Sequence, residues 1–327
     1  AYRADVLYSR PLCVIIGRSG NMKNQGSVAV IHVAKYLDGN DRLCGHNCLF
    51  CMEQMEPGCS NEQLPDLETI DAALTRYRKS HGKISKIYIA GGEPTLRGDF
   101  SELAKLVRRH CQTTVLSTNC DYADENETIR CIIDAGIRLV ATSIHGASSA
   151  SHDYLTGKAG SFFHTISAMK KLMDAGVAVT VNTVVNAFNV QEMAEIAQMF
   201  QRKNLGVEKL TFTHYLHHGN AYYHNALWFN VDDCANTIAE AVKAADGVRY
   251  KVTFRDFPLC LNSSLAERQE IVEQIDIIGL QPNQLNVRGE KAPSFAKNKC
   301  RQCALFDACP KYLAANYGEE INHGRVD

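Results

Sequence analysis

Residues 86–117 read KIYIAGGEPTLRGDFSELAKLVRRHCQTTVLS and hold one complete strand–loop–helix–strand unit. The β-branched run Lys86–Ile89 predicts a buried strand, and Ser101–His110 has the apolar spacing of an amphipathic helix. Thr114–Ser117 predicts the next strand. Because a helix that joins two consecutive strands is typical of a parallel sheet, this unit indicates an α/β fold.

The same alternation extends on both sides of this unit, from about residue 27 to residue 215. Further strands are expected at Val28–Val33, Leu139–Ile144, Val177–Val185 and Lys209–Thr213. Further helices are expected at Leu67–Ser80, Glu125–Ala135, Phe162–Ala175 and Val190–Lys203. Six strands are too few for a closed eight-stranded barrel, so the sequence predicts a partial (β/α)6 TIM-like barrel of parallel strands.

The pattern weakens beyond about residue 220, where a helical segment near Asp232–Asp246 and a strand-like Tyr250–Phe254 precede a stretch with little periodicity. A region of this kind needs another source of order, which a metal site would supply. We therefore expect three parts along the chain: an N-terminal extension at 1–26, a core at 27–220 and a small C-terminal domain at 221–327.

The composition excludes several classes of partner. The chain has 327 residues, of which 45% are hydrophobic and 22% charged, and its formal net charge is −1. This balance gives no basic footprint for nucleic acid. There is no run of 18 apolar residues and no apolar signal region at Ala1–Asp5, so we expect no membrane partner and a cytoplasmic location.

The chain contains 13 cysteines, an odd number that disfavours a disulfide framework in a chain without a signal peptide. Six of them stand apart and are interpreted as buried thiols: Cys13, Cys59, Cys111, Cys120, Cys131 and Cys234. The other seven form two sets that have the spacing of metal ligands: Cys44, Cys48 and Cys51, and then Cys300, Cys303 and Cys309 with the distant Cys260.

The first set supplies three thiolates and no obvious fourth ligand. Structural zinc takes four protein ligands, so a zinc site here would need His46 or Cys59 as well. An iron–sulfur cubane held by three cysteines instead leaves one iron open to an exogenous ligand. The spacing therefore favours a catalytic [4Fe–4S] cluster on Cys44, Cys48 and Cys51.

The first cysteine set, with Phe50 before its last member, and the turn Gly91-Gly92-Glu93-Pro94 resemble the radical S-adenosylmethionine (SAM) superfamily over about residues 27–220. Without the cysteines, that turn would be interpreted as an ordinary strand-to-helix connection. The resemblance implies that the open iron binds SAM. It also implies that an electron from a reductase or flavodoxin-type donor cleaves SAM to a 5′-deoxyadenosyl radical, which takes hydrogen from a substrate.

The resemblance also implies a set of SAM contacts: Phe50, Gly91, Gly92, Glu93, Pro94, Ser117, Asn119, Ser143 and Asn182. Simple capping of strand ends is the alternative for the last four. Many relatives carry an arginine for the SAM carboxylate where this chain has Leu155 and Thr156, so the carboxylate partner stays open. Three residues are expected near the mouth as substrate contacts, with a surface loop as the alternative for the last two: His145, His214 and Tyr215.

The second cysteine set, Cys260, Cys300, Cys303 and Cys309, resembles the twitch and SPASM extensions of this superfamily. It has too few cysteines for two clusters, so one auxiliary [4Fe–4S] cluster is expected, with a four-cysteine zinc site as the alternative. A fully ligated cluster would accept or relay an electron. The sequence therefore predicts a radical SAM oxidoreductase acting on a small metabolite or short peptide.

Two other functions stay open. A radical SAM enzyme that crosslinks or epimerises a peptide would use the same initiation chemistry. A zinc-binding structural protein would make the Gly91–Pro94 turn coincidental.

Overall fold

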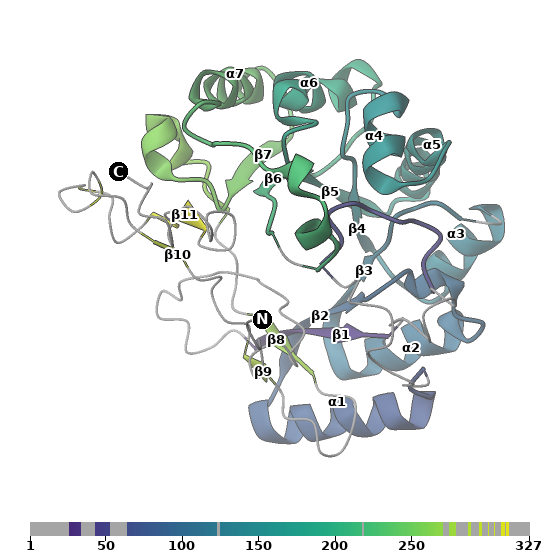
Figure 1. Ribbon diagram of the computed structural model, residues 1–327. Coiled ribbons are helices and arrows are strands. Elements are labelled where there is room, and N and C mark those ends of the chain that lie inside the picture. The colour runs from purple at the N-terminus through teal and green to yellow at the C-terminus, as the bar shows by residue number, and fades with distance from the viewer. Residues whose placement is uncertain are drawn as a thin grey trace.

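A computed structural model shows the chain folded around one curved sheet (Figure 1). The structure describes residues 26–33, 43–52, 64–122, 125–217, 219–270 and 275–278, and short pieces at 287–288, 294–295, 300, 304, 309–310 and 312–313. The expected N-terminal extension lies outside these residues, except for its last position.

The sheet has the strand order β7-β6-β5-β4-β3-β2-β1-β8-β9 within the described part of the chain. Its strands are β1 (Ser27–His32), β2 (Ile84–Ala90), β3 (Cys111–Ser117), β4 (Leu139–Ser143), β5 (Ala178–Val185), β6 (Lys209–His214), β7 (Lys251–Arg255), β8 (Ile275–Ile277) and β9 (Val287–Arg288). Strands β1 to β8 run parallel to their neighbours, whereas β9 pairs with β8 in the antiparallel sense. The sheet curls into an open half-barrel, so the predicted partial TIM-like barrel is confirmed (Figure 1).

The helices lie on the convex side of this sheet (Figure 1). They are α1 (Leu67–His81), α2 (Phe100–His110), α3 (Glu125–Asp134), α4 (Ser149–Thr156), α5 (Ser161–Asp174), α6 (Met193–Arg202) and α7 (Ala235–Asp246). Short 3-10 turns lie at Pro94–Leu96, Val190–Glu192, Gly219–Tyr223, Asn225–Leu227, Leu259–Leu261 and Ser263–Leu265, and a separate ribbon pairs β10 (Ser294–Phe295) with β11 (Tyr312–Leu313). No helix in the described ranges is both long and apolar enough to cross a membrane.

The main hydrophobic core lies between the convex face of the sheet and these helices. Alternate strand residues such as Ile87, Val140 and Phe212 are fully buried there with helix residues such as Leu103 and Phe200. Because successive side chains of a strand point to opposite faces, the residues between them line the concave face. The residues buried on the convex face therefore identify, by alternation, the side chains that lie on the concave face.

Local capping explains where several helices begin and end. The Asp66 carboxylate accepts from the Thr69 N–H at 2.8 Å and begins α1, and Gly82, with φ +79°, ends it. Ser148 caps α4 in the same way, since its side chain accepts from the Ser151 N–H. The sequence pattern did not predict this helix. With only eight residues and a polar composition, α4 lacks the apolar stripe that predicts a longer helix.

The sheet is larger than the expected six strands. The strand-like segment near residue 250 forms β7, which pairs with β6, and β8 adds a strand beside β1. The parallel sheet therefore continues past residue 220, where the C-terminal domain was expected to start. A separate auxiliary-cluster domain within 221–327 stays a prediction.

Candidate functional site

The first cysteine set lies on residues 43–52, which follow β1 and which we call the cysteine loop. The end of α4 holds the middle of this loop. The Asn47 N–H donates to the Thr156 carbonyl at 2.8 Å, and the Leu49 N–H donates to the Leu155 carbonyl at 3.0 Å. Backbone hydrogen bonds of this kind give the cysteine loop a defined position without a regular element of its own.

Residues 219 and 220 hold the C-terminal end of the cysteine loop. Asn220 donates from its side-chain amide to the Cys48 carbonyl at 2.7 Å and from its backbone N–H to the Cys51 carbonyl at 2.8 Å. A Cβ on Gly219, where φ is +61°, would lie 2.5 Å from the Cys51 carbonyl oxygen, so only glycine allows this approach. Residues 219 and 220 follow β6, whereas the cysteine loop follows β1. These contacts therefore connect the ends of two strands that lie five positions apart in the sheet.

The Gly91–Pro94 turn lies against the other side of the cysteine loop. The Glu93 N–H donates to the Leu43 carbonyl at 2.7 Å. Gly91 has φ +89°, and a Cβ there would lie 3.1 Å from the Cα of His32, at the end of β1. The turn that follows β2 is therefore packed directly against the strand and loop that carry the cysteines.

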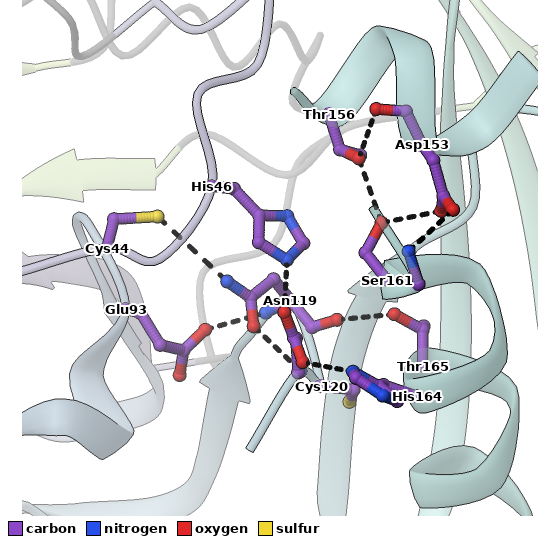
Figure 2. A network of polar contacts seen from close by, with 12 residues as sticks. Cys44, His46, Glu93, Asn119, Cys120, Asp153, Thr156, Ser161, His164 and Thr165 are labelled. Carbon is purple, nitrogen blue, oxygen red and sulfur yellow. Dashed lines mark hydrogen bonds and ion pairs between the residues drawn. The ribbon is translucent and has the colours of Figure 1, made fainter. Parts of the chain in front are cut away.

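Glu93 is almost fully buried and joins the turn after β2 to the turn after β3 (Figure 2). Its Oε1 accepts from the Thr95 hydroxyl at 2.6 Å, the Thr95 N–H at 3.2 Å and the Thr118 hydroxyl at 2.9 Å. Its Oε2 accepts from the Asn119 N–H at 2.7 Å. Burial raises the pKa of Glu93, although these hydrogen bonds favour the carboxylate. Oε2 keeps capacity for one more donor, because a carboxylate oxygen has two lone pairs.

Each polar group of Asn119 has a partner (Figure 2). Its N–H donates to Glu93, its carbonyl accepts from the Thr165 hydroxyl at 2.9 Å, and its Oδ1 accepts from the Asp121 N–H at 2.9 Å. The remaining group, Nδ2, lies 3.9 Å from Cys44 Sγ and faces the thiol. The structure therefore places Asn119 beside a predicted cluster ligand.

Asp121 links the cysteine loop to α5 through two histidines. Its Oδ2 lies 3.1 Å from His46 Nε2, and its Oδ1 lies 2.7 Å from His164 Nδ1. His46 lies between Cys44 and Cys48 and is buried, and burial lowers its pKa against the opposing effect of Asp121. This contact is a further tie on the part of the loop that carries the thiols.

The donor set of the cysteine loop fits an iron–sulfur cluster in its chemistry. Among the described residues, no three His, Cys, Asp or Glu side chains already converge on a metal position. Burial first, and then the nearby charges of Cys51 and Cys44, raise the pKa of Cys48 well above its usual value. Thiolates that repel one another in a desolvated loop are stabilised by a cationic iron core, which binds thiolates preferentially.

Three of the predicted SAM contacts lie on one face of the sheet. Ser143 of β4 pairs with Asn182 of β5, and Ser117 of β3 pairs with Ala141, two residues before Ser143. The Asn182 Oδ1 accepts from the Thr213 hydroxyl at 2.7 Å. The structure thus brings these three polar side chains together on the concave face, while their contact with SAM stays a prediction.

Leu155 and Thr156 lie where the resemblance implied an arginine for the SAM carboxylate, and the threonine has hydrogen-bond partners within the protein. The Thr156 hydroxyl donates to the His152 carbonyl at 3.0 Å and lies 2.9 Å from Ser161 Oγ, and the side chain is buried (Figure 2). Thr156 therefore stabilises the junction between α4 and α5. The residue that would hold the SAM carboxylate stays open.

Phe50 and His145 pack against each other, with ring centroids 4.4 Å apart. The His145 Nδ1 accepts from the Val184 N–H at 3.2 Å, and the backbone N–H of His145 donates to His152 Nδ1 at 3.0 Å. Burial, and then the charges of His152 and His46, lower the pKa of His145 well below its usual value, so its ring is neutral. The substrate contact expected for His145 stays a prediction, because its side chain is buried in this packing.

His214 and Tyr215 lie in an aromatic cluster. The His214 ring centroid is 5.0 Å from that of Phe229 and 5.4 Å from that of Phe257, and the exposed fraction is 3% for His214 and 1% for Tyr215. The surface-loop alternative is therefore wrong for both residues. Burial lowers the pKa of His214 to about 4, which keeps the ring neutral, and substrate contact by either residue stays a prediction.

The second cysteine set is only partly described, since Cys303 lies outside the described residues. Cys300 and Cys309 are buried, whereas Cys260 is exposed. The Leu259 N–H donates to Cys309 Sγ at 3.3 Å, which places the Cys309 thiol beside the backbone next to Cys260. Residues 50 positions apart are thus brought together, and their role as ligands stays a prediction.

Several residues that position the cysteine loop were not identified from the sequence. Asp121 and His164 gave no motif, and Asn220 is 172 residues from Cys48. No local spacing relates partners so far apart. The one usable signal was the glycine before Asn220, because glycine is the residue that allows a close backbone approach.

The comparisons with known proteins agree with this geometry. Residues 42–200 match the family model described as the radical SAM superfamily. GTP 3',8-cyclase of Aquifex aeolicus is 27% identical over 53% of this chain and 53% of its own length. PqqA peptide cyclase of Methylocella silvestris is 26% identical over 50% of this chain and 44% of its own length. The chain thus spans about half the length of the curated relatives it matches.

The fold is also similar to solved structures. Streptococcus suis SuiB bound to S-adenosylmethionine superposes with a TM-score of 0.60 over 90% of this chain and 74% of that one, at 13% identity. The maturase HydG from Carboxydothermus hydrogenoformans gives 0.52 over 77% of this chain and 59% of that one, at 13% identity. The matched family model defines the class of this part of the chain: residues 42–200 belong to the radical SAM superfamily of enzymes, and the half-barrel and the cysteine loop at its rim agree with that match.

Proposed function

We propose that this chain cleaves SAM reductively and uses the resulting 5′-deoxyadenosyl radical to take a hydrogen atom from a small metabolite or short peptide. The observation that carries the proposal is the cysteine loop, which holds Cys44, Cys48 and Cys51 beside the Gly91–Pro94 turn. Among the relatives, one is named as a cyclase of GTP and another as a cyclase of the peptide PqqA, so both substrate sizes occur in similar chains.

Cys44, Cys48 and Cys51 would hold the cluster, which when bound supplies the electron for SAM cleavage and one open iron for SAM. The protein's own task is binding, orientation and exclusion of water. Ties from Asn220, from the end of α4 and from Asp121 would keep the cysteine loop in place during this chemistry. Ser117, Ser143 and Asn182 would contact SAM from the concave face, with Gly91, Gly92, Glu93 and Pro94 in the adjoining turn.

An auxiliary [4Fe–4S] cluster on Cys260, Cys300, Cys303 and Cys309 would make the enzyme an oxidoreductase. The hydrogen bond from Leu259 to Cys309 Sγ supports this, because N–H groups that donate to sulfur are typical of cluster ligands. A four-cysteine zinc site would use the same residues but could not accept an electron, which would favour a redox-neutral reaction such as an epimerisation. A flavodoxin-type electron donor and a cytoplasmic location remain predictions from the sequence.

The experiment is an anaerobic reconstitution of the chain with iron and sulfide, followed by incubation with SAM, dithionite and deuterated candidate substrates. Formation of 5′-deoxyadenosine, with deuterium in it when the right substrate is present, is the expected result. Cys48→Ala should abolish it, whereas Cys131→Ala, which removes a thiol outside both sets, should not. Zinc with no iron in the reconstituted wild-type protein would contradict the proposal.

A further inference from the structure

The concave face of strands β5, β6 and β7 is polar, which is unusual for a parallel sheet. Parallel strands are commonly covered on both faces and consist of near-continuous apolar runs. Here β5 (AVTVNTVV), β6 (KLTFTH) and β7 (KVTFR) alternate between a mainly apolar and a mainly polar set instead, with Thr183 and Val184 as the exceptions in β5. One set of residues lies in the core against the helices, so the other set lines a polar concave surface.

The strand register identifies the members of this polar surface. Asn182 pairs with Thr211, and Thr211 pairs with Thr253, so these residues form one row across the three strands. Thr213 pairs with Arg255 in the next row toward the carboxyl ends of the strands. The Thr211 and Thr253 hydroxyls lie 3.0 Å apart, which confirms that the side chains share a face.

Arg255 is a partly buried cation of this surface whose nearest ion-pair contact is long. Its side chain is 24% exposed, and its Nε is buried without a hydrogen-bond partner among the residues that the structure describes. The nearest carboxylate oxygen in an ion pair with it, Glu270 Oε1, is 4.0 Å from Nη2. A guanidinium presents donors in a planar fork, and leaving a buried donor unpaired costs free energy.

Glu270 is already committed to another cation. Its Oε1 accepts from Lys209 Nζ at 2.5 Å. Burial opposes ionisation of Glu270, but the hydrogen bond and charge of Lys209, with help from Thr253 and Arg255, hold its pKa below the usual value. Around Glu270, Lys209 and Arg255 bring two positive charges and Glu270 brings one negative charge, so these three groups carry one net positive charge. Lys251, an exposed cation on the same face of β7, stands four residues from Arg255 and is not part of this group.

We propose that Arg255 binds a carboxylate of the substrate on the concave face, so that the substrate is a carboxylic acid. This inference rests on the proposed function, because it assigns the substrate class of the same site. A carboxylate matches the guanidinium fork with two parallel hydrogen bonds and matches the single net charge. A phosphate monoester, with a charge of about −1.5 to −2, would leave negative charge uncompensated.

The position of Arg255 also indicates the length that the substrate needs. Ser143, a predicted SAM contact, lies on β4, three strands from β7. With a strand spacing of about 4.8 Å, the two are separated by about 14 Å along the sheet, and the curvature shortens the direct path. A substrate that is held at Arg255 and reaches SAM would therefore have to span about this distance.

The test uses the reconstituted full chain and the arginine reagent p-hydroxyphenylglyoxal, with modification of Arg255 followed by peptide mass spectrometry. The probes are acetate, N-acetylglycine, the neutral isostere N-acetylglycinamide, and inorganic phosphate, all at one ionic strength set with chloride. If acetate alone protects Arg255 from modification, the carboxylate comes from a small acid. If N-acetylglycine protects Arg255 more strongly, the carboxylate comes from a peptide.

A carboxylate probe at twice its dissociation constant should slow the modification of Arg255 about threefold, because only a third of the sites remains free. The neutral isostere should have no effect. The variant Lys251→Gln removes an exposed cation from the same face of β7 and should show the same protection. Protection by chloride or by the neutral isostere as strong as that by carboxylates, or by phosphate alone, would overturn the inference.

The same samples are assayed for 5′-deoxyadenosine, which separates this inference from the proposed function. Formation of 5′-deoxyadenosine without carboxylate protection at Arg255 would refute only the substrate class. Protection at Arg255 without 5′-deoxyadenosine would refute only the radical chemistry.

Discussion

Replacing Glu93 with Gln tests whether this residue is an internal anchor of the site or only a ligand for SAM. The better orientation of Gln keeps its oxygen where Oε1 accepts three hydrogen bonds from Thr95 and Thr118. The NH2 group of the Gln then faces the Asn119 N–H. In the wild-type protein, Glu93 Oε2 accepts from that N–H at 2.7 Å. Two donors meet there, and the hydrogen bond between the turns after β2 and β3 is lost.

The size of the effect follows from that lost contact. A hydrogen bond to a charged acceptor contributes about 1.5–3 kcal/mol, and an unpaired buried donor adds a cost of its own. The variant no longer buries a carboxylate, which offsets part of this loss of stability. We therefore expect Glu93→Gln to lower the free energy of unfolding by about 2 kcal/mol. For a chain of 327 residues that corresponds to a fall in Tm of roughly 3 °C.

The pH dependence gives the effect a second signature. Because burial raises the pKa of Glu93 above its ordinary value of 4.5, the folded protein holds the proton more tightly than the unfolded chain. The stabilisation from this group is fully present below pH 4.5 and is lost as the pH rises through the raised pKa. The difference in stability between wild type and Glu93→Gln should therefore grow as the pH falls.

The assay is thermal and urea unfolding of the cluster-free protein without SAM, at several pH values. Glu102→Gln is the matched control, since Glu102 is an exposed residue in the first turn of α2 and should change stability by no more than about 0.5 kcal/mol. A Glu93→Gln protein as stable as the control would refute the anchor role and leave Glu93 as a ligand for SAM alone.

Three further changes test other parts of the structure. Asn220→Ala removes the hydrogen bond to the Cys48 carbonyl, so we expect a loss of about 1 kcal/mol in stability and faster loss of iron to a chelator, with Asn236→Ala as the exposed control. Arg97→Leu breaks two contacts of 2.7 Å with Asp99 and leaves the Val33 carbonyl unpaired, so urea unfolding should show a loss of about 3 kcal/mol, and a change below 1 kcal/mol would show that the site repacks. Cys303→Ala should keep part of the SAM cleavage but block product formation, and an equal, complete loss of cleavage in a folded variant would contradict a separate role for the second cysteine set.

The fold was readable from the sequence where apolar periodicity is strong. Each strand from β1 to β6 was expected within a few residues of its position, because buried β-branched runs alternate with amphipathic helices. The strand β8 was missed because Ile275–Ile277 is too short to show a period. Helix α4 was missed because caps at Ser148 and Gly157 define it rather than an apolar stripe.

The sequence predicts those parts of the site whose ligands are close together in the chain. It does not predict the contacts between residues that are far apart in the chain. The spacing of Cys44, Cys48 and Cys51 lies within eight residues and needs no tertiary information. The anchors of the same loop come from the ends of α4 and β6, and only folding brings them there. The burial of His214 was also unreadable, because its aromatic neighbours come from later segments.

The most direct measurement of the central claim is the electron paramagnetic resonance spectrum of the anaerobically reconstituted, dithionite-reduced chain before and after addition of SAM. We predict the signal of a reduced [4Fe–4S] cluster whose g values change when SAM is added, with that response lost in Cys48→Ala. A signal that SAM leaves unchanged in the wild-type protein, or the absence of any cluster signal, would contradict it.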